Sequence, residues 1–145
     1  MYIRIVQVVL DTSVVVSAFR SRHGASNAVM RQVAAGIVIP LATPALFLEY
    51  EDVLKRPAQR AVSGLSLADV DRVLDALARA ILPIETHFMW RPQLRDANGE
   101  MVLEAAVNGR AAAIVTHIER DFMAAAARFG LEVLTPRRLM ERMEG

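Results

Sequence analysis

The sequence predicts an α/β fold in which helices cover both faces of a parallel sheet. Short apolar runs rich in β-branched residues recur along the chain, and such runs are typical of parallel strands buried on both faces. Segments with helical signals separate these runs, and strands that alternate with helices favour parallel pairing. We expect a single domain over residues 1–145, with three α/β/α layers, because this length is enough for one hydrophobic core.

Composition excludes several classes of protein. Apolar residues make up 54% of the chain, which argues against disorder, and a net charge of +1 gives no overall field toward nucleic acid. The absence of cysteine excludes disulfides and thiolate metal sites. The N-terminus lacks a basic segment and a cleavage site, and no uninterrupted apolar run of ~18 residues occurs. We therefore expect a soluble, cytoplasmic protein without membrane contact.

The first strand is expected at residues 5–10, a run that is mostly apolar, rich in β-branched residues and short for a helix. Helical segments follow at 14–20 and 25–35, and the second stops at a glycine, the usual residue after a helix C-terminus. A short strand is expected at 37–42. Pro40 within it suggests an edge position or a strand end, because proline has no N–H to donate to a neighbouring strand.

Helix-start signals organise the middle of the chain. Thr43-Pro44 predicts a helix that runs to about Arg56, where Pro57 stops it. The stretch Ser66–Asp69 resembles a capping box and predicts a helix to about residue 80. The remaining elements expected are a strand at 81–85, an irregular connection at 86–94, a turn at 95–99, a helix at about 100–107, a strand at 111–116, a helix at 119–129, a strand at 131–134 and a short C-terminal helix after Thr135-Pro136.

Asp11 is the first candidate functional residue. It follows the first strand directly and is itself followed by two hydroxyl residues, Thr12 and Ser13. In open α/β sheets, ligands gather outside the carboxyl ends of the strands, so a carboxylate at that position indicates a ligand site rather than a part of the core. Thr116 repeats the position of Asp11 at the end of a later apolar strand.

Glu49 is the second candidate. It lies on the apolar side of its predicted helix, which also carries Leu46, Tyr50, Val53 and Leu54. Its neighbours Glu51 and Asp52 each have a basic residue one turn later, whereas Glu49 has none. Glu49 either reaches water at the rim of the sheet, or is protonated or neutralised by a cation.

Three further acids have competing interpretations. Glu100 begins a predicted helix, where an acid ordinarily compensates the helix dipole, and Asp96 fits a turn or cap residue. Glu104, one turn after Glu100, is a competing candidate. Asp121 is either a charge in the cap region of the next helix or part of the same cluster. Four acids near strand exits would repel each other without a metal, and oxygen-only ligands favour Mg²⁺ or Mn²⁺, the usual partners of phosphoryl chemistry.

Five segments, in order along almost the whole chain, carry a resemblance to a known family: residues 9–18, 44–54, 95–106, 115–122 and 134–136. Through them the chain resembles PIN-domain proteins, of the VapC-like branch found as toxins in bacterial toxin–antitoxin systems. The resemblance implies a Rossmann-like, PIN-like sheet and a Mg²⁺- or Mn²⁺-dependent ribonuclease that acts on RNA. It also implies a homodimer that a cognate protein antitoxin silences.

The resemblance also implies roles for particular residues. The acidic cluster that binds the metal would consist of Asp11, Glu49, Glu100 and Asp121, with Asp96 as the fallback for the third member. Thr12 or Ser13, together with Thr116, would position metal-bound water or the RNA phosphate.

Two positions depart from the family pattern. Similar chains usually have several aspartates before the helix where this chain has the longer Glu100, and they often have Asn or Asp where this chain has Ile118, which cannot bind a metal. Two functions therefore stay open: a metal-dependent endoribonuclease, and a PIN-like module that binds an antitoxin or RNA without cutting. A phosphoacceptor domain would need a lysine after a late strand, and Lys55 is the only lysine. An Asp-x-Asp phosphatase is excluded because Ser13 occupies the second position.

Overall fold

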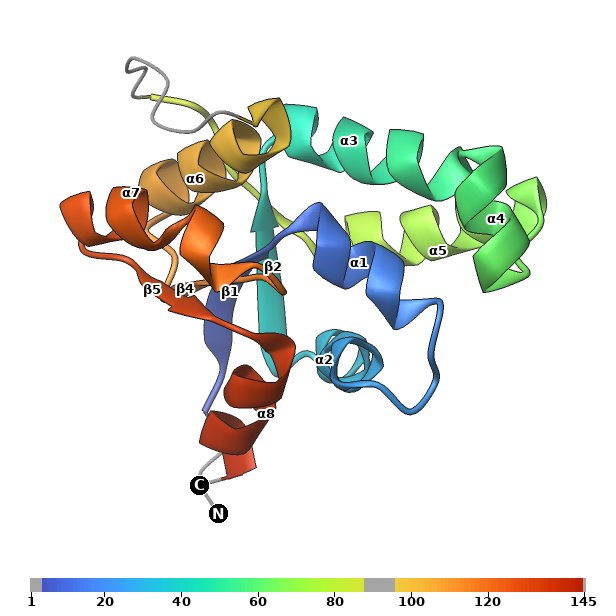
Figure 1. Ribbon diagram of the computed structural model, residues 1–145, viewed down its shortest axis with the longest axis horizontal. Coiled ribbons are helices and arrows are strands. Elements are labelled where there is room, and N and C mark those ends of the chain that lie inside the picture. Colours follow the sequence, from blue (N-terminus) through green and yellow to red (C-terminus); the bar gives the residue numbers. More distant parts are fainter. Residues whose placement is uncertain (1–3, 88–95, 145) are drawn as a thin grey trace.

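A computed structural model of the protein describes residues 4–87 and 96–144 and confirms the α/β fold (Figure 1). In the described residues, five parallel strands form one sheet in the order β3-β2-β1-β4-β5. The strands are β1 (Val6–Leu10), β2 (Val38–Ala42), β3 (Leu82–Pro83), β4 (Ala113–Val115) and β5 (Glu132–Leu134).

Helices cover both faces of this sheet. They are α1 (Thr12–Ala18), α2 (Ala25–Ala34), α3 (Pro44–Lys55), α4 (Pro57–Ser63), α5 (Leu67–Ala80), α6 (Ala97–Gly109), α7 (Met123–Arg128) and α8 (Pro136–Glu144), with a short 3₁₀ helix, η1 (Glu119–Asp121), before α7. The chain moves from β1 toward β3 and then returns past β1 to β4 and β5, so right-handed crossovers place the two sets of connecting helices on opposite faces. Accordingly, α1, α2 and α8 pack together, while α6 packs on β1, β2 and β4 from the other side (Figure 1).

The strand order creates a switch point between β1 and β4. From β1 the chain crosses to β2 on one side, whereas β4 pairs with β1 on the other side. In open α/β sheets, ligands bind in the crevice outside the carboxyl ends of the strands at such a point. Asp11 and Thr116 are the residues that directly follow β1 and β4. The topology therefore brings the two strand-end residues singled out in the sequence to the same place.

The core lies around the central strand. Val8, Val9 and Leu10 of β1 are completely buried, as are Leu46 and Tyr50 on the predicted apolar side of α3. Fully burying an aliphatic side chain of this kind stabilises the fold by about 1.5–3 kcal/mol. A large part of the core is thus adjacent to the residues that follow β1.

The predicted helix starts are confirmed at two places. Thr43 caps α3, since its hydroxyl oxygen accepts a hydrogen bond of 3.2 Å from the backbone N–H of Leu46. Ser66 and Asp69 form a reciprocal capping box at the start of α5, with bonds of 3.1 and 3.0 Å. The backbone N–H of Ser66 donates to the Asp69 carboxylate, and this hydrogen bond holds the pKa of the Asp69 carboxyl below its usual range.

The expectation that Pro40 marks an edge strand or a strand end is wrong, because β2 pairs with β1 on one side and with β3 on the other, and Pro40 is at its centre. The carbonyl of Ile37 accepts from β1, and the carbonyl of Ala42 accepts from Ile84 beyond β3. Alternate residues of a strand face the same neighbour, so the Pro40 nitrogen points toward β3. β3 is parallel to β2 and pairs only with Leu41 and Ala42, so it begins just after the position where a donor is missing.

Other boundaries shift for local reasons. Pro57 ends α3 but also occupies the first turn of an additional helix, α4, where a proline needs no N–H. α6 begins at Ala97, three residues before the expected start, with Asp96 as its N-cap residue. The helix expected at 119–129 is divided into η1 and α7. None of the helices in the described part of the chain is long and apolar enough to cross a membrane.

Candidate functional site

Asp11 lies at the carboxyl end of β1 with its side chain almost entirely buried. Its backbone N–H donates to the carbonyl of Val115 at 2.9 Å, which extends the β1–β4 pairing to this residue. Asp11 is also the N-cap residue of α1, but its side chain makes no capping hydrogen bond. An N-cap aspartate commonly uses its carboxylate to cap the helix. Here the carboxylate is directed to other partners instead.

Two hydroxyl groups hold one oxygen of this carboxylate. Ser13 donates to Asp11 Oδ2 at 2.9 Å, and Thr116 donates to the same atom at 2.7 Å. The Thr116 hydroxyl oxygen also accepts from the backbone N–H of Ile118 at 3.1 Å, so its proton is available for Asp11. The strand-end pair expected from the sequence thus forms a direct contact in the structure.

The other carboxylate oxygen, Oδ1, is not held by any described residue. Within the described residues it has no hydrogen-bond partner, and no buried side-chain nitrogen or oxygen of that part of the chain is left without one. Oδ1 of Asp11 must therefore be in contact with solvent, although the residue as a whole is only 6% exposed. A carboxylate with one oxygen fixed by the protein and one open to solvent has the arrangement of a ligand-binding group.

Thr12 connects the site to α6. Its hydroxyl oxygen accepts a hydrogen bond of 2.7 Å from the side-chain amide of Asn98, in the first turn of α6. Asp96, the exposed N-cap residue of that helix, accepts from the backbone N–H of Asn98 at 3.1 Å, as expected for a cap residue. Glu100 is half-buried in the same turn. The contact between Thr12 and Asn98 therefore holds the start of α6, which carries Glu100, against the start of α1.

Tyr50 connects α3 to the end of β1. Its hydroxyl is completely buried and donates to the carbonyl of Leu10, the residue before Asp11. Burial, and to a smaller extent the nearby charge of Asp11, raise the pKa of Tyr50 far above its usual range. The phenol thus remains a neutral donor at all physiological pH values.

Glu49 is half-buried beside Tyr50, and its carboxylate has no hydrogen bond or ion pair to any described residue. Glu51 and Asp52, in contrast, pair with Lys55 at 2.9 Å and Arg56 at 2.7 Å. The hydrogen bonds that Lys55 donates to Glu51 and Asp71 raise the pKa of Lys55. The contrast between Glu49 and its acidic neighbours, expected from the sequence, is confirmed.

The remaining predicted ligands do not join into a compact cluster. Asp121 is exposed at the end of η1, and Ile118 is 44% exposed before it. Among residues 4–87 and 96–144, no group of three or more Asp, Glu or His side chains lies close enough to hold one metal ion. The structure thus joins Asp11, Ser13 and Thr116 by direct hydrogen bonds, and it joins Thr12 to the start of α6 through Asn98. The four-acid metal site stays a prediction.

A groove of about 410 Å³ opens beside these residues. Thr12, Ser13 and Ser17 of α1 line it, together with Arg20, Gln59 and His117. The sequence marked His117 only as the residue after Thr116. In the structure its Nε2 lies 2.7 Å from the buried Oγ of Ser26. The roles of Asn98, Tyr50 and Ser26 had no signal in the sequence, because each depends on a partner far away along the chain.

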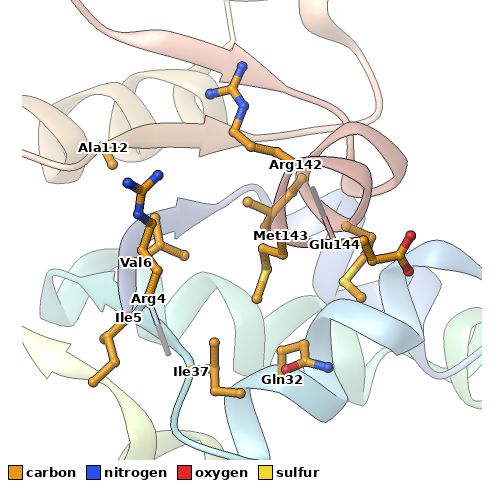
Figure 2. Close-up of a pocket in the computed structure, with 11 residues that line it drawn as sticks. Arg4, Ile5, Val6, Gln32, Ile37, Ala112, Arg142, Met143 and Glu144 are labelled. Carbon is orange, nitrogen blue, oxygen red and sulfur yellow. The ribbon is translucent and has the colours of Figure 1, made fainter. Parts of the chain in front are cut away.

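A second, larger cavity, of about 940 Å³, lies elsewhere (Figure 2). Val6 begins β1, and Ile37 and Ala112 directly precede β2 and β4, so this cavity is at the amino ends of the parallel strands. Met143 of α8 points into it, and the guanidinium groups of Arg4 and Arg142 lie at its edge (Figure 2). Because Asp11 follows the carboxyl end of β1, this cavity is at the opposite end of the sheet from the candidate site.

Comparison with known families gives a match to the PIN domain over residues 7–117. The matched segment contains Asp11, Glu49, Glu100 and Thr116, and ends before Ile118 and Asp121. Among curated proteins, no sequence matches this chain.

Proposed function

Because the chain belongs to the PIN domain family, we propose that it is a metal-dependent endoribonuclease. PIN domains are generally nucleases, so hydrolysis of a nucleic-acid phosphodiester is the chemistry that family membership supports. RNA as the substrate, Mg²⁺ or Mn²⁺ as the cofactor, and a toxin role go beyond that membership and belong to this proposal.

The observation that carries the proposal is the open oxygen of Asp11. Its partner oxygen is fixed by Ser13 and Thr116, and the residue follows the central strand at the switch point of the sheet. This is the place where α/β folds bind ligands. A buried carboxylate whose free oxygen faces solvent is suited to bind a hard cation, because cations of that class prefer oxygen ligands.

The residues present fit such a cation in their chemistry. Mg²⁺ usually keeps several of its waters and is bound by one or two carboxylates together with substrate phosphates, so a compact set of three acids is not required. Asp11 would be the direct ligand, and Glu49, Glu100 and Asp121 are the proposed further ligands, direct or through water. A bound ion would supply an activated water and neutralise the charge that develops on the phosphate.

The residues around Asp11 orient its carboxylate. Thr116 and Ser13 fix the Asp11 carboxylate in one direction, so that little reorganisation is needed when substrate binds. Tyr50 stays neutral and holds the carbonyl of Leu10, which prevents the end of β1 from moving. Thr12 and Ser13 both line the adjacent groove. The Ser13 proton is donated to Asp11, whereas the Thr12 hydroxyl accepts from Asn98 and keeps its own proton to donate to a phosphate oxygen.

The test is cleavage of a labelled single-stranded RNA by the purified chain, with Mg²⁺, with Mn²⁺ and with EDTA. The proposal expects internal cleavage with at least one of the two metals and none with EDTA. Equal cleavage in EDTA would show that the nuclease does not need a metal, and an absence of cleavage under every condition would favour a binding module.

A second function, a PIN-like module that binds RNA or a protein antitoxin without cutting, is supported by two observations. Ile118 cannot bind a metal, and the described residues contain no compact group of three acids. Calorimetric titration with Mn²⁺ discriminates between the two functions. A module predicts no binding of Mn²⁺, whereas the nuclease predicts binding that depends on the acids near Asp11.

The biological setting is part of the same proposal. A toxin role, a cognate protein antitoxin and a homodimer rest on the VapC-like resemblance of the five segments at 9–18, 44–54, 95–106, 115–122 and 134–136. Sedimentation of the purified chain tests the dimer directly. Expression with and without the protein of the adjacent gene tests the antitoxin, because an antitoxin would relieve growth inhibition.

A further inference from the structure

We propose that the groove along α1 is a subsite that binds the backbone of single-stranded RNA next to the cleaved phosphodiester, with Arg20 and His117 as its phosphate-binding residues. This inference rests on the proposed function, since it assigns a substrate path to the same site. The groove begins at Ser13, whose hydroxyl is bonded to Asp11, and continues to Arg20 beyond the end of α1.

The charge of the groove favours an anion. Among the described residues that line it there is no carboxylate, although acids are frequent on the neighbouring surface of α3. Arg20 has no carboxylate partner in the described chain, and its Nη2 donates to the neutral amide oxygen of Gln59 at 2.7 Å. A guanidinium that is oriented by a neutral partner keeps its full charge and its remaining donors for a phosphate.

The position of Arg20 assigns it to a different phosphate from the one at Asp11. Ser13 and Arg20 are seven residues apart on and just beyond α1, which corresponds to about 10 Å along the helix axis at 1.5 Å per residue. The groove is therefore long enough for more than one backbone group. Ser17 places a hydroxyl group between these ends, and Thr12 places another beside Ser13.

His117 is held for the same purpose by a buried hydroxyl. Its Nε2 is 2.7 Å from the Ser26 Oγ, and Ser26 is only 2% exposed. Within the described residues the other ring nitrogen, Nδ1, has no partner, and the ring lines the groove. When the Ser26 hydroxyl donates to Nε2, the neutral ring carries its proton on Nδ1 and presents a donor to the groove. Ser26 is thus a positioning residue for His117.

The groove should contribute affinity without sequence preference. Nucleic-acid grooves that recognise bases usually offer aromatic side chains for stacking, whereas the described lining of this groove contains no Phe, Tyr or Trp. Its donors are hydroxyl, amide, imidazole and guanidinium groups, which suit the phosphate and sugar. Contacts of that kind fix the register of a strand but carry no base information.

The experiment measures binding of a fluorescein-labelled single-stranded RNA in EDTA by fluorescence anisotropy over a range of salt concentrations. Arg20→Gln should weaken binding roughly tenfold, and should reduce the slope of log Kd against log salt by about 0.7, the value for one phosphate contact on a single strand. Arg22→Gln is the matched control, since Arg22 is an exposed arginine two residues away that does not line the groove. Equal losses for the two variants would overturn the subsite.

The role of Ser26 is tested by a double-mutant cycle. Ser26→Ala should weaken RNA binding in the presence of His117, by roughly fivefold, and should have no effect in the His117→Ala background. Additive losses would show that Ser26 acts on stability alone and does not position His117.

Cleavage assays with metal separate this inference from the proposed function. If RNA binds through Arg20 but is not cut, the subsite proposal stands and the nuclease proposal is overturned. If wild type and Arg20→Gln cut RNA with the same KM, the nuclease proposal stands and the subsite proposal is overturned. Binding of a polyanionic peptide as strong as binding of RNA, with the same loss in Arg20→Gln, would also overturn an RNA subsite.

Discussion

Thr116 Oγ1 lies 2.7 Å from Asp11 Oδ2, and this hydrogen bond joins the ends of two neighbouring parallel strands across 105 residues of sequence. Thr116 is completely buried, and its hydroxyl oxygen already accepts from the Ile118 N–H. The direction of the Asp11 carboxylate is therefore determined by the sheet itself. A group fixed in this way can act on a ligand without first being ordered.

Replacing Thr116 by valine tests this relationship. Thr116→Val keeps the shape of the side chain but removes the donor to Asp11, so we expect RNA cleavage to fall roughly tenfold and the free energy of unfolding to fall by about 1–2 kcal/mol. Thr116→Ser keeps the hydroxyl and should retain most of the activity. Cleavage by Thr116→Val at the wild-type rate would show that the contact does not serve the reaction.

Tyr50 predicts a dependence of stability on pH. Its pKa in the folded state is raised, mainly by burial, so the stability it contributes is complete below the unfolded value of about 10 and is lost as the pH rises above it. Urea denaturation of wild type and Tyr50→Phe should show wild type more stable by about 1–2 kcal/mol at neutral pH, because the Phe variant leaves the Leu10 carbonyl without its donor. Above pH 10 the difference should shrink by about 1.4 kcal/mol per pH unit. A constant difference would contradict the assignment.

Asn98 should support activity without touching the substrate. Asn98→Ala removes the hydrogen bond to Thr12 that holds the first turn of α6 at the site, and we expect kcat to fall about tenfold with a smaller change in KM. Thr12→Ala should reduce the effect of the Asn98 change in a double-mutant cycle. Full additivity of the two losses would mean that the contact is not what couples α6 to α1.

Glu49 should contribute to metal binding, whereas Glu51 should not. Both lie on α3, but only Glu51 has a described partner, Lys55. In calorimetric titrations with Mn²⁺, Glu49→Gln should weaken binding roughly tenfold, and Glu51→Gln should leave it unchanged. Equal affinities for wild type and Glu49→Gln would remove Glu49 from the proposed ligands.

Local signals made much of the fold predictable. The caps at Thr43 and Ser66 form within a single turn, so the sequence contains everything that determines them. Asp11 was recognisable because a buried strand ends at a polar residue. The position of β2 within the sheet was not predictable from Pro40, because it depends on where the short strand β3 begins.

The site was predictable only where its residues end strands. Asn98 and Thr12 are 86 residues apart, and Ser26 and His117 are 91 apart, so no spacing pattern relates them. The acids at 49, 100 and 121 were grouped because the chain resembles a family. The distances between these acids depend on helix packing that the sequence does not specify. Asp121 in particular is exposed at the end of a 3₁₀ helix rather than within the first turn of a longer helix.

The most direct test of the proposed nuclease is RNA cleavage by Asp11→Asn in the presence of Mg²⁺ or Mn²⁺. The amide oxygen of asparagine can replace Oδ2 as acceptor from Ser13 and Thr116, so the fold should persist while the negative charge is removed. Asp52→Asn, on the exposed surface of α3, serves as the control. The proposal predicts that Asp11→Asn has no metal-dependent cleavage while Asp52→Asn cleaves like wild type, and undiminished cleavage by a folded Asp11→Asn would contradict it.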